Sequence, residues 1–544
     1  MTTRLETATS AKADVNAAES VQHHELADTV IDAQVATGKE QTMSLLKGIK
    51  LYPKAIGWSV LLSTAIIMEG YDGVLMGSFY AVDSFNRKYG TLQPDGSYSL
   101  SAAWQAGLSN SMSVGQIFGL FICGLVSERL GYRKTMLSAL FAVTCFIFIL
   151  FFAPSLEVLC AGEVLMGISL GVFQTITVTY ASEVCPVVLR CYLTTYVNLC
   201  WVIGQLIASG VLRGFVTRED EWAYRIPFAI QWVWPIPIMV GVFLAPESPW
   251  WLVRQGREKD AVASLQRLTS RGDTDFNPDE TVAMMIHTNE LEKEIEQGTT
   301  FLDCFRGVDL RRTEIVCLAW GAQNLCGSGI MGYSTYFYTQ AGLSTENAFN
   351  MSLGQAGLGF FGTLFSWYLM THYGRRSLYV GGLATLFIIL MAVGFSSLAD
   401  NSKSATSWAT GSLLLVYTFF YDLTVGPVCY SLVSELSSTR LRAKTIVLAR
   451  NLYNILSIVN GVIIPYMLNP TAWNWRGKAG FFWAGLCGLC VIWSFFRLPE
   501  PKGRTYGELD KLFQQGVSPR KFKETTVDPF ENEISLKEKE ELNE

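Results

Sequence analysis

Two acidic residues stand three positions apart inside a strongly apolar stretch of this sequence. Glu69 and Asp72 lie near the middle of residues 57–79, GWSVLLSTAIIMEGYDGVLMGSF, which is long enough to cross a bilayer as a helix. Residues three apart share one face of a helix. A charge at this depth costs roughly 2.5–3.5 kcal/mol, so it persists where it faces a wet cavity, meets a partner charge or carries a proton. The pair is either structural, saturated by neighbouring helices, or, as we favour, a proton-binding site.

The composition indicates an all-α membrane protein with many spans. Of the 544 residues, 50% are hydrophobic and only 16% are charged, well below the charged share of a soluble domain. Apolar stretches of membrane-spanning length recur through most of the chain. We place twelve spans, at residues 55–79, 104–126, 135–153, 157–182, 191–213, 226–245, 313–340, 347–371, 377–397, 407–434, 443–467 and 476–497.

A polar segment divides the predicted spans six and six. Its amphipathic pieces 258–268 and 279–298 predict short cytosolic helices rather than spans. Lys47, Lys50 and Lys54 precede the first span, which places the N-terminus in the cytoplasm, and an even number of spans places the C-terminus there too. We expect a disordered cytoplasmic tail at 1–50, a six-helix bundle at 51–249, linker helices at 250–312, a second six-helix bundle at 313–500 and a cytoplasmic tail at 501–544.

Three charged motifs of the first half recur in the second half at a nearly constant distance. Such a repeat predicts two homologous half-bundles with a substrate site between them near the middle of the membrane. The pairs are SEVCPVVLR (182–190) with SELSSTRLR (434–442), ERLGYRK (128–134) with HYGRRS (372–377), and PESPWW (246–251) with LPEPKGR (498–504).

These motifs place acids and arginines together at helix ends on the side of the N-terminus. We predict a cytoplasmic gate of ion pairs that joins the halves when the protein opens outward and separates when it opens inward. One exposed pair contributes about 0–1 kcal/mol, but a network can bias two states of similar energy. The alternative is ordinary positive charge that sets topology. The gate residues are Glu128, Arg129, Arg133, Glu183, Arg190, Arg375, Arg376, Glu435 and Arg442.

Amides, hydroxyls and aromatic residues interrupt the predicted spans 5, 7, 10 and 11. Amides donate to and accept from hydroxyl groups, and ring faces cover the apolar surface of a sugar, so the set suits a neutral polyol. The glycines around residues 327–332 and Gly426-Pro427 allow helices to unwind beside a cavity. Interhelical hydrogen bonding is the alternative for any single amide. The candidate substrate-binding residues are Gln205, Gln323, Asn324, Ser328, Tyr333, Tyr430, Arg450 and Asn451.

Arg450 is a cation at membrane depth and requires an anion. We expect the only other charges at membrane depth to be Glu69, Asp72 and Glu163, which are the candidates for proton coupling. An arginine nearby favours the ionised carboxylate, whereas burial favours the protonated form. A site that alternates between these surroundings would couple proton binding to substrate movement.

Other function classes find little support. The sequence shows no nucleophile–base arrangement, metal-ligand spacing or phosphate loop, so we expect no enzyme, metal or cofactor. The four histidines, His23, His24, His287 and His372, fall in tail or loop segments, and the cysteines fit small buried hydrophobic residues. A net charge of −5 gives no indication of nucleic-acid binding.

Seven motifs make the chain resemble the sugar porter family of the major facilitator superfamily from about residue 50 to 515. They are GYDGVLMG (70–77), ERLGYRK, SEVCPVVLR, PESPWWL (246–252), GRR (374–376), SELSSTRLR and PEPKGRTYGELDKLF (499–513). PESPWWLVRQGR, YASEVCP and AWGAQNLCGSGIMGYSTYFY are most similar to the fungal maltose permease subgroup. The resemblance implies a plasma-membrane carrier that imports maltose, sucrose or a related alpha-glucoside together with protons.

The resemblance also implies roles for single residues. Asp72 matches the family's proton-linked acid on span 1, and Gln205 matches the sugar-binding glutamine of span 5. Gln323 and Asn324 occupy the Gln-Gln pair of span 7, where the second position departs from the pattern.

Three further departures alter the sugar cavity or the proton site. Tyr430 stands where the family has a tryptophan, Arg450 where some members have a sugar-contacting glutamine, and Glu163 where the family has an arginine. These changes fit a larger sugar than a monosaccharide.

Two other readings remain open from the sequence. One is a facilitator or a symporter for another sugar or polyol, and the other is a non-transporting sugar sensor, for which longer tails are expected. Besides sugar, protons and the lipid bilayer, lysines in both tails are candidate acceptors for ubiquitin-dependent turnover. Asn350 opens a glycosylation sequon almost at the membrane.

Overall fold

The computed structural model describes residues 36, 39, 43–93, 96–270, 276–296, 300–398, 404–438, 441–502, 504 and 506–525. His23, His24 and most of the predicted N-terminal tail lie outside these residues, as does the C-terminal tail beyond residue 525. The described end of the predicted N-terminal tail is helical, as α2 (Leu45–Leu51).

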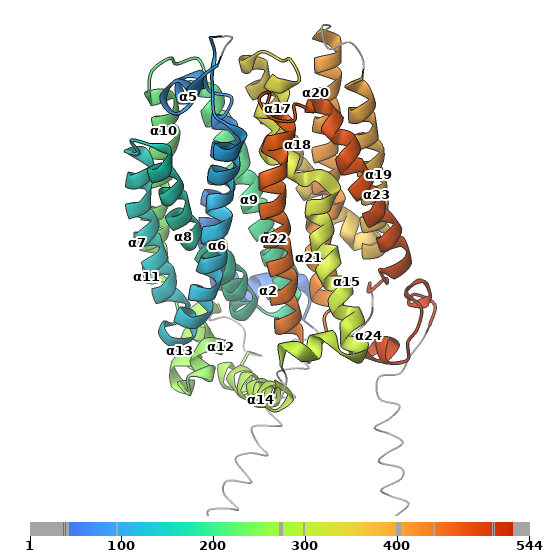
Figure 1. Cartoon of the computed structure of the whole chain (residues 1–544). Coiled ribbons are helices and arrows are strands. Elements are labelled where there is room, and N and C mark those ends of the chain that lie inside the picture. Colours follow the sequence, from blue (N-terminus) through green and yellow to red (C-terminus); the bar gives the residue numbers. More distant parts are fainter. Residues whose placement is uncertain are drawn as a thin grey trace, which may run out of the picture.

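The described residues form two helical bundles that stand side by side (Figure 1). The first contains α3 (Pro53–Ser63), α4 (Ala65–Phe79), α6 (Ala102–Leu130), α7 (Tyr132–Phe151), α8 (Leu156–Val184), α9 (Val187–Phe215), α10 (Trp222–Ile230), η1 (Gln231–Val233) and α11 (Pro235–Leu244). The second contains α15 (Gly307–Gln323), η3 (Asn324–Ser328), α16 (Gly329–Gly332), α17 (Ser334–Gln340), α18 (Thr345–His372), α19 (Arg375–Ser396), α20 (Ser404–Phe420), η4 (Tyr421–Val425), α21 (Gly426–Leu436), α22 (Arg442–Leu468), η5 (Arg476–Lys478) and α23 (Ala479–Arg497).

Ten helices of the described chain are long and apolar enough to cross a membrane, and they correspond to ten of the twelve predicted spans. The other two predicted spans are helical as well. Span 7 is divided among α15, η3, α16 and α17, and span 8 is the glycine- and serine-containing helix α18. The predicted all-helical architecture of two bundles is therefore confirmed.

Short helices mark the two ends of the bundles. We call one end the linker face, because α12 (Pro249–Arg254), α13 (Glu258–Leu268), α14 (Pro278–Glu296), η2 (Phe301–Phe305), α24 (Tyr506–Gln514) and η6 (Pro519–Lys521) lie there (Figure 1). The opposite face carries α5 (Asp83–Tyr89) and a two-residue hairpin, β1 (Thr91–Leu92) and β2 (Tyr98–Ser99), paired antiparallel with Thr91 opposite Ser99. The predicted linker helix 258–268 is confirmed as α13.

Serine side chains define where several helices begin. Ser101 accepts a hydrogen bond from the backbone N–H of Trp104 at the start of α6, and Ser344 does the same at the start of α18, both at 3.4 Å. An N-cap of this kind satisfies a backbone donor that the first turn leaves free.

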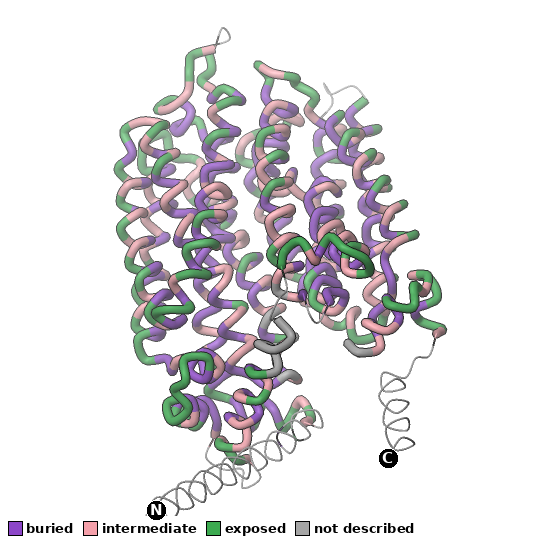
Figure 2. The backbone as a smooth tube through the Cα atoms, turned by 60° about the horizontal axis from the view of Figure 1, so that its bottom comes forward, coloured by how far each residue is buried: buried purple, intermediate pink, exposed green. Residues whose placement is uncertain are grey.

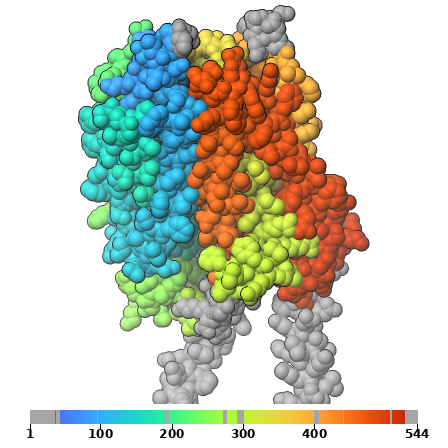
Figure 3. Space-filling view, viewed as in Figure 1, coloured from blue at the N-terminus to red at the C-terminus, as the bar shows by residue number. Residues whose placement is uncertain are grey.

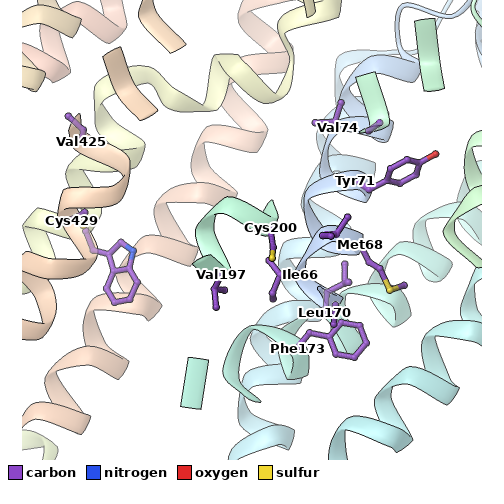
Figure 4. Packing of buried hydrophobic residues seen from close by; sticks show 14 of the residues in the cluster. Ile66, Met68, Tyr71, Val74, Leu170, Phe173, Val197, Cys200, Val425 and Cys429 are labelled. Atoms are coloured by element: carbon purple, nitrogen blue, oxygen red, sulfur yellow. The ribbon is translucent and has the colours of Figure 1, made fainter. Parts of the chain in front are cut away.

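The apolar core runs through each bundle, and the outer surface is also apolar. Figure 4 shows Met68 and Tyr71 of α4 near Leu170 and Phe173 of α8. Figure 2 shows buried segments lining the inner helix faces and exposed segments on the outside. Large exposed side chains, such as Phe141 at 65%, project from the outer helices. Such a surface is suited to lipid rather than water.

The two broken spans of the second bundle contain π-helical turns. Gly327 within η3 has a φ of 93°, a conformation that a residue with a side chain rarely adopts. η4 directly precedes Gly426 and Pro427, and proline lacks the backbone N–H that a regular helix would use. The predicted unwinding at both glycine-containing stretches is confirmed.

Glycines allow α6 and α8 to approach closely. A Cβ atom added at Gly167 would lie 2.2 Å from the carbonyl oxygen of Met112, and one added at Gly115 would lie 2.1 Å from that of Val164. Backbones in such close contact hold α8 in a fixed position against α6. This contact also fixes Glu163, which α8 carries.

We predict that Gly167→Val lowers the thermal stability of the purified protein and its folded yield strongly, because the side chain has no space against the α6 backbone. Gly214→Val on α9 is the matched control, since a Cβ there meets nothing within 4 Å. Fluorescence-detected size exclusion after heating measures both, and equal melting temperatures for the two variants would contradict the close packing.

Candidate substrate and proton site

Asp72 and Glu163 form a carboxyl pair inside the first bundle. Both side chains are fully buried, Asp72 on α4 and Glu163 on α8, and their carboxyl groups are direct neighbours. Gln231 of η1 donates from Nε2 to Asp72 Oδ1 at 2.7 Å. Asp72 Oδ2 and both Glu163 oxygens accept no hydrogen bond from any other described donor. Because two ionised carboxylates in contact repel, this arrangement can hold one proton between them.

Glu69 reaches the other bundle through a single glutamine. Its Oε1 accepts from Gln116 Nε2 on α6 at 3.1 Å and from Gln174 Nε2 on α8. The side-chain carbonyl of Gln174 in turn accepts from Arg450 Nη2 on α22 at 2.6 Å. Arg450 therefore meets the predicted acid pair of span 1 indirectly, through Gln174. This chain of hydrogen bonds joins a cation of the second bundle to a carboxylate of the first.

Aromatic rings surround the guanidinium of Arg450. Its carbon atom lies 4.9 Å from the ring centre of Tyr453 and 5.5 Å from that of Trp320. Each such contact contributes about 0.5–2 kcal/mol. Trp320 also meets Tyr430 edge-on, with ring centres 5.8 Å apart, and Tyr430 is 45% exposed. The buried Nε1 of Trp320 has no acceptor among the described residues, so this cluster can donate to a hydroxyl group of a ligand.

The amides of Gln323 and Asn324 are engaged with neighbouring helices in this conformation. Gln323 Nε2 donates to the carbonyl of Gly426 at 2.9 Å, and Asn324 Nδ2 donates to that of Tyr453 at 3.0 Å. Asn460 Nδ2 donates to the Asn324 backbone carbonyl at 2.9 Å. These bonds satisfy the backbone that the π-helical turns disturb, so both amides serve here as interhelical links.

The remaining candidate substrate residues have separate surroundings. Ser328 donates locally to the Gln323 carbonyl at 2.6 Å. The ring of Tyr333 stacks on Tyr80 of the first bundle, with centres 6.3 Å apart. Gln205 on α9 and Asn451 on α22 are half-buried. Arg450 and Tyr430 both contact Trp320 and so belong to one cluster, whereas Ser328 hydrogen-bonds within the broken span 7.

Several residues of the site were not anticipated from the sequence. Gln116, Gln174 and Gln231 bind the acids, but an isolated glutamine in a span is equally an interhelical link. Trp320 lies in the AWGAQN motif, yet its partner Arg450 is 130 positions away.

The prediction that Glu69, Asp72 and Glu163 are the only other charges at membrane depth is wrong. Asp422 in η4 also falls within predicted span 10, and its Oδ2 lies against α18, 2.6 Å from where a Cβ on Gly359 would sit. The signal in the sequence is the acid itself, in the apolar stretch YDLTVGP.

The bundles are joined towards the opposite face. Arg213 at the end of α9 contacts Glu346 and Asn350 of α18, each at 2.5 Å. Asn469, which is fully buried, donates from Nδ2 to the Leu100 carbonyl at 3.0 Å. Figure 3 shows side chains of α6 and α22 in contact along the upper part of the seam. Asn350, the sequon residue, thus contributes a contact between bundles.

Charged motifs at the linker face hold helix ends within the first bundle. Glu247 accepts the backbone N–H groups of Tyr132 and Arg133, at 3.1 and 3.3 Å, where α7 begins. Burial raises the pKa of the Glu247 carboxyl, and these N–H groups oppose that shift. Glu183 accepts from the Tyr132 hydroxyl at 3.0 Å and pairs with Arg254 at 2.8 Å.

The second bundle repeats this arrangement, as the paired motifs predict. Glu500 accepts the backbone N–H groups of Arg375 and Arg376, at 2.8 and 3.1 Å, where α19 begins. Arg375 also pairs with Glu435 at 3.3 Å. The two acids Glu247 and Glu500 therefore occupy equivalent positions. Glu435 pairs with an arginine of the second bundle, and Glu183 pairs with Arg254 of α12, next to the first bundle.

The other predicted gate residues lie at the same face. The backbone carbonyl of Glu128 accepts from Trp251 Nε1 at 3.1 Å, and Arg129 beside it is exposed. Arg190 lies in the first turn of α9, and Arg442 begins α22. In the part of the chain that the structure describes, no three His, Cys, Asp or Glu side chains are grouped so as to hold a metal ion.

Two pseudo-symmetric bundles of apolar helices, with buried acids in one and a facing cation in the other, define a membrane transporter. Residues 58–513 match the family model described as sugar (and other) transporter, and the chain belongs to that family.

Its relatives include permeases of Saccharomyces cerevisiae. The chain is 44% identical over 515 residues to the maltose permease MAL61. The matched region covers 93% of this chain and 83% of that protein. It is likewise 44% identical over 504 residues to the general alpha-glucoside permease, covering 92% and 82%. These proteins are permeases and not enzymes.

Solved structures of similar fold include a xylose transporter. The partially occluded inward open form of XylE from E. coli matches with a TM-score of 0.68 and 18% identity, over 83% of this chain and all of that chain (100%). The proton:xylose symporter XylE bound to 6-bromo-6-deoxy-D-glucose matches with a TM-score of 0.69 and 19% identity, over 85% and 99%. At this identity the likeness concerns the fold.

We predict that Glu247→Ala and Glu500→Ala each lower the melting temperature of the purified protein, since each leaves two backbone N–H groups at a helix start without an acceptor. A lost cap of this kind costs about 1 kcal/mol. Glu219→Ala, an exposed acid in a loop, is the control. Differential scanning fluorimetry in detergent measures the shifts, and a change confined to one of the two variants would contradict their equivalence.

Proposed function

We propose that this chain imports an alpha-glucoside disaccharide, such as maltose or sucrose, by proton symport across the plasma membrane. Support for the substrate comes from the relatives described as maltose and general alpha-glucoside permeases, which match along nearly the whole chain. The observation that carries the proton coupling is the buried pair Asp72–Glu163. Gln231 donates to one of its four oxygens, and the other three accept no hydrogen bond from a described residue.

The sugar would bind between the bundles, where side chains of both converge. Trp320 and Tyr430 offer ring surface and a free N–H on the side of the second bundle, and Gln205 faces them from α9 in this proposal. A disaccharide presents hydroxyl groups and apolar C–H faces, and both kinds of surface are matched by amides and rings. Gln323 and Asn324 would contribute after the helix breaks around them rearrange.

Proton and sugar movements are coupled, in this proposal, through Arg450. In the present conformation Arg450 is held by Gln174, which also binds Glu69. When the bundles separate at the opposite face, Arg450 leaves this contact and the carboxyls of α4 lose a nearby cation. Loss of the cation favours proton uptake, and its return favours proton release, so the state of the acids follows the state of the bundles.

The linker face is assigned to the cytoplasm in this proposal, with both termini on that side. Lys47, Lys50 and Lys54 before span 1 support this orientation by the positive-inside rule. The contacts of Arg213 and Asn469 then close the outer side. The charged motifs at the linker face form the cytoplasmic gate, which stiffens each bundle in the present state and would meet across the seam when the carrier opens outward.

We predict that cells lacking their own carriers take up labelled maltose or sucrose when they express this chain, and that the weakly buffered medium becomes alkaline at once. Glucose should produce neither effect, because the departures at Tyr430 and Arg450 fit a larger sugar. Uptake without any proton movement would identify a facilitator instead. Absence of uptake of every sugar, in cells with the protein at the surface, would contradict the proposed substrate class.

We predict that Asp72→Asn abolishes accumulation of the sugar against its gradient, because an amide cannot exchange a proton. Exchange of labelled for unlabelled sugar across the membrane should persist, since it requires no net proton movement. Asp83→Asn on α5, which removes an exposed acid near the same helix, is the matched control. Undiminished accumulation by Asp72→Asn would exclude this residue from the coupling.

A further inference from the structure

A groove opens where span 1 meets the linker helix α13, away from the site between the bundles. Its volume is about 710 Å³. Lys54, Gly57, Trp58 and Leu61 line it from α3, and Gln266 and Arg267 line it from α13. The spacing of the α3 residues places all four on one face of that helix.

The groove changes from charged to apolar along its length. Lys54 stands near the linker face, and Leu61 lies two turns deeper, a distance of roughly 10 Å along the helix. Leu61 packs against α11, where a Cβ on Gly241 would lie 2.5 Å from it. Trp58 between them is half-buried, at a depth where amphipathic rings are common at a membrane surface. A phospholipid has the same order of groups, a charged head above an apolar chain.

Both cations of the groove are available to an anion. Lys54 is exposed and forms no ion pair with a described residue. Arg267 donates from Nη2 to the carbonyl of Leu244, the last residue of α11, at 2.7 Å. This bond to a neutral acceptor holds the guanidinium at the groove. Arg267 forms no ion pair with a described residue, so its positive charge can attract an anion.

We propose that this groove binds an anionic phospholipid of the cytoplasmic leaflet, with the headgroup between Lys54 and Arg267 and an acyl chain along Gly57, Trp58 and Leu61. The leaflet follows from the orientation given under the proposed function, but the binding itself does not depend on which solute is carried. Basic pockets between helices on that side favour anionic headgroups. The groove's apolar floor selects a lipid over a soluble phosphate.

A lipid bound here would contact two parts of the chain at once. α3 leads directly into α4, which carries Glu69 and Asp72, and α13 belongs to the segment that joins the bundles. The lipid therefore ties the linker to the helix of the acid pair. Occupancy should raise the stability of the first bundle and change the rate of transport without changing the sugar that is carried.

The test measures binding of phosphatidylserine to the full-length protein in phosphatidylcholine nanodiscs, by native mass spectrometry and by the melting temperature. The double variant Lys54→Gln/Arg267→Gln should bind phosphatidylserine about 30-fold more weakly, since each cation near an anionic headgroup contributes to its attraction. Lys50→Gln/Lys259→Gln is the matched control, because it removes the same charge from exposed positions of α2 and α13 that do not line the groove.

A second variant keeps both cations and removes the space. A Cβ added at Gly57 meets nothing within 4 Å, so Gly57→Leu fits without disturbing the helices and fills the groove. It should also weaken phosphatidylserine binding and abolish the lipid-dependent rise in melting temperature. This variant separates loss of binding from any effect of Arg267 on the fold.

Four results would overturn the proposal. They are equal binding of phosphatidylcholine and phosphatidylserine, equal binding of soluble glycerophosphoserine, wild-type binding by the double variant, and wild-type binding by Gly57→Leu. Because no sugar or proton gradient is present, failure here leaves the transport proposal untouched, and a carrier that moves another solute would still pass this test.

Discussion

Two carboxyl groups in contact inside an apolar bundle form the constraint on which the rest of this structure depends. Asp72 and Glu163 are fully buried. The amide of Gln231 donates to one of their four oxygens, and the other three accept no hydrogen bond from a described residue. No described cation forms an ion pair with either carboxyl group. A shared proton is the simplest way to satisfy the pair. The close packing of α4, α8 and α6 keeps the two groups together, since glycines at the α6–α8 contact leave no room for adjustment.

The contact between Arg450 and Gln174 makes the state of the acids depend on the relation between the bundles. Among the described residues, the hydrogen bonds that link Glu69 to the second bundle run through this amide. A hydrogen bond through glutamine is easier to break than a direct buried ion pair, whose rupture would leave two uncompensated charges. An indirect link is therefore suited to a carrier that must break and remake the contact in each cycle. The aromatic rings around Arg450 stabilise the cation whether or not Gln174 is bound.

Much of the fold could be predicted from sequence, because apolar length, glycine and charged repeats act locally. The helix breaks at Gly327 and before Pro427 and the equivalent roles of Glu247 and Glu500 were accessible in this way. The site was accessible only in part. Spacing placed Glu69 and Asp72 on one helix, but their different partners, Gln174 and Glu163, depend on how α8 crosses α4. Whether Gln323 and Asn324 face a cavity or a backbone carbonyl depends on packing between helices far apart in sequence.

The central claim is that Asp72 and Glu163 share a proton which sugar movement releases. Infrared difference spectroscopy of the purified protein, with and without maltose, reports protonated carboxyl groups directly. The account predicts a protonated-carboxyl band that changes when sugar binds and that disappears in both Asp72→Asn and Glu163→Gln. A spectrum in which neither substitution alters this band, or in which sugar leaves it unchanged while transport continues, would contradict the account.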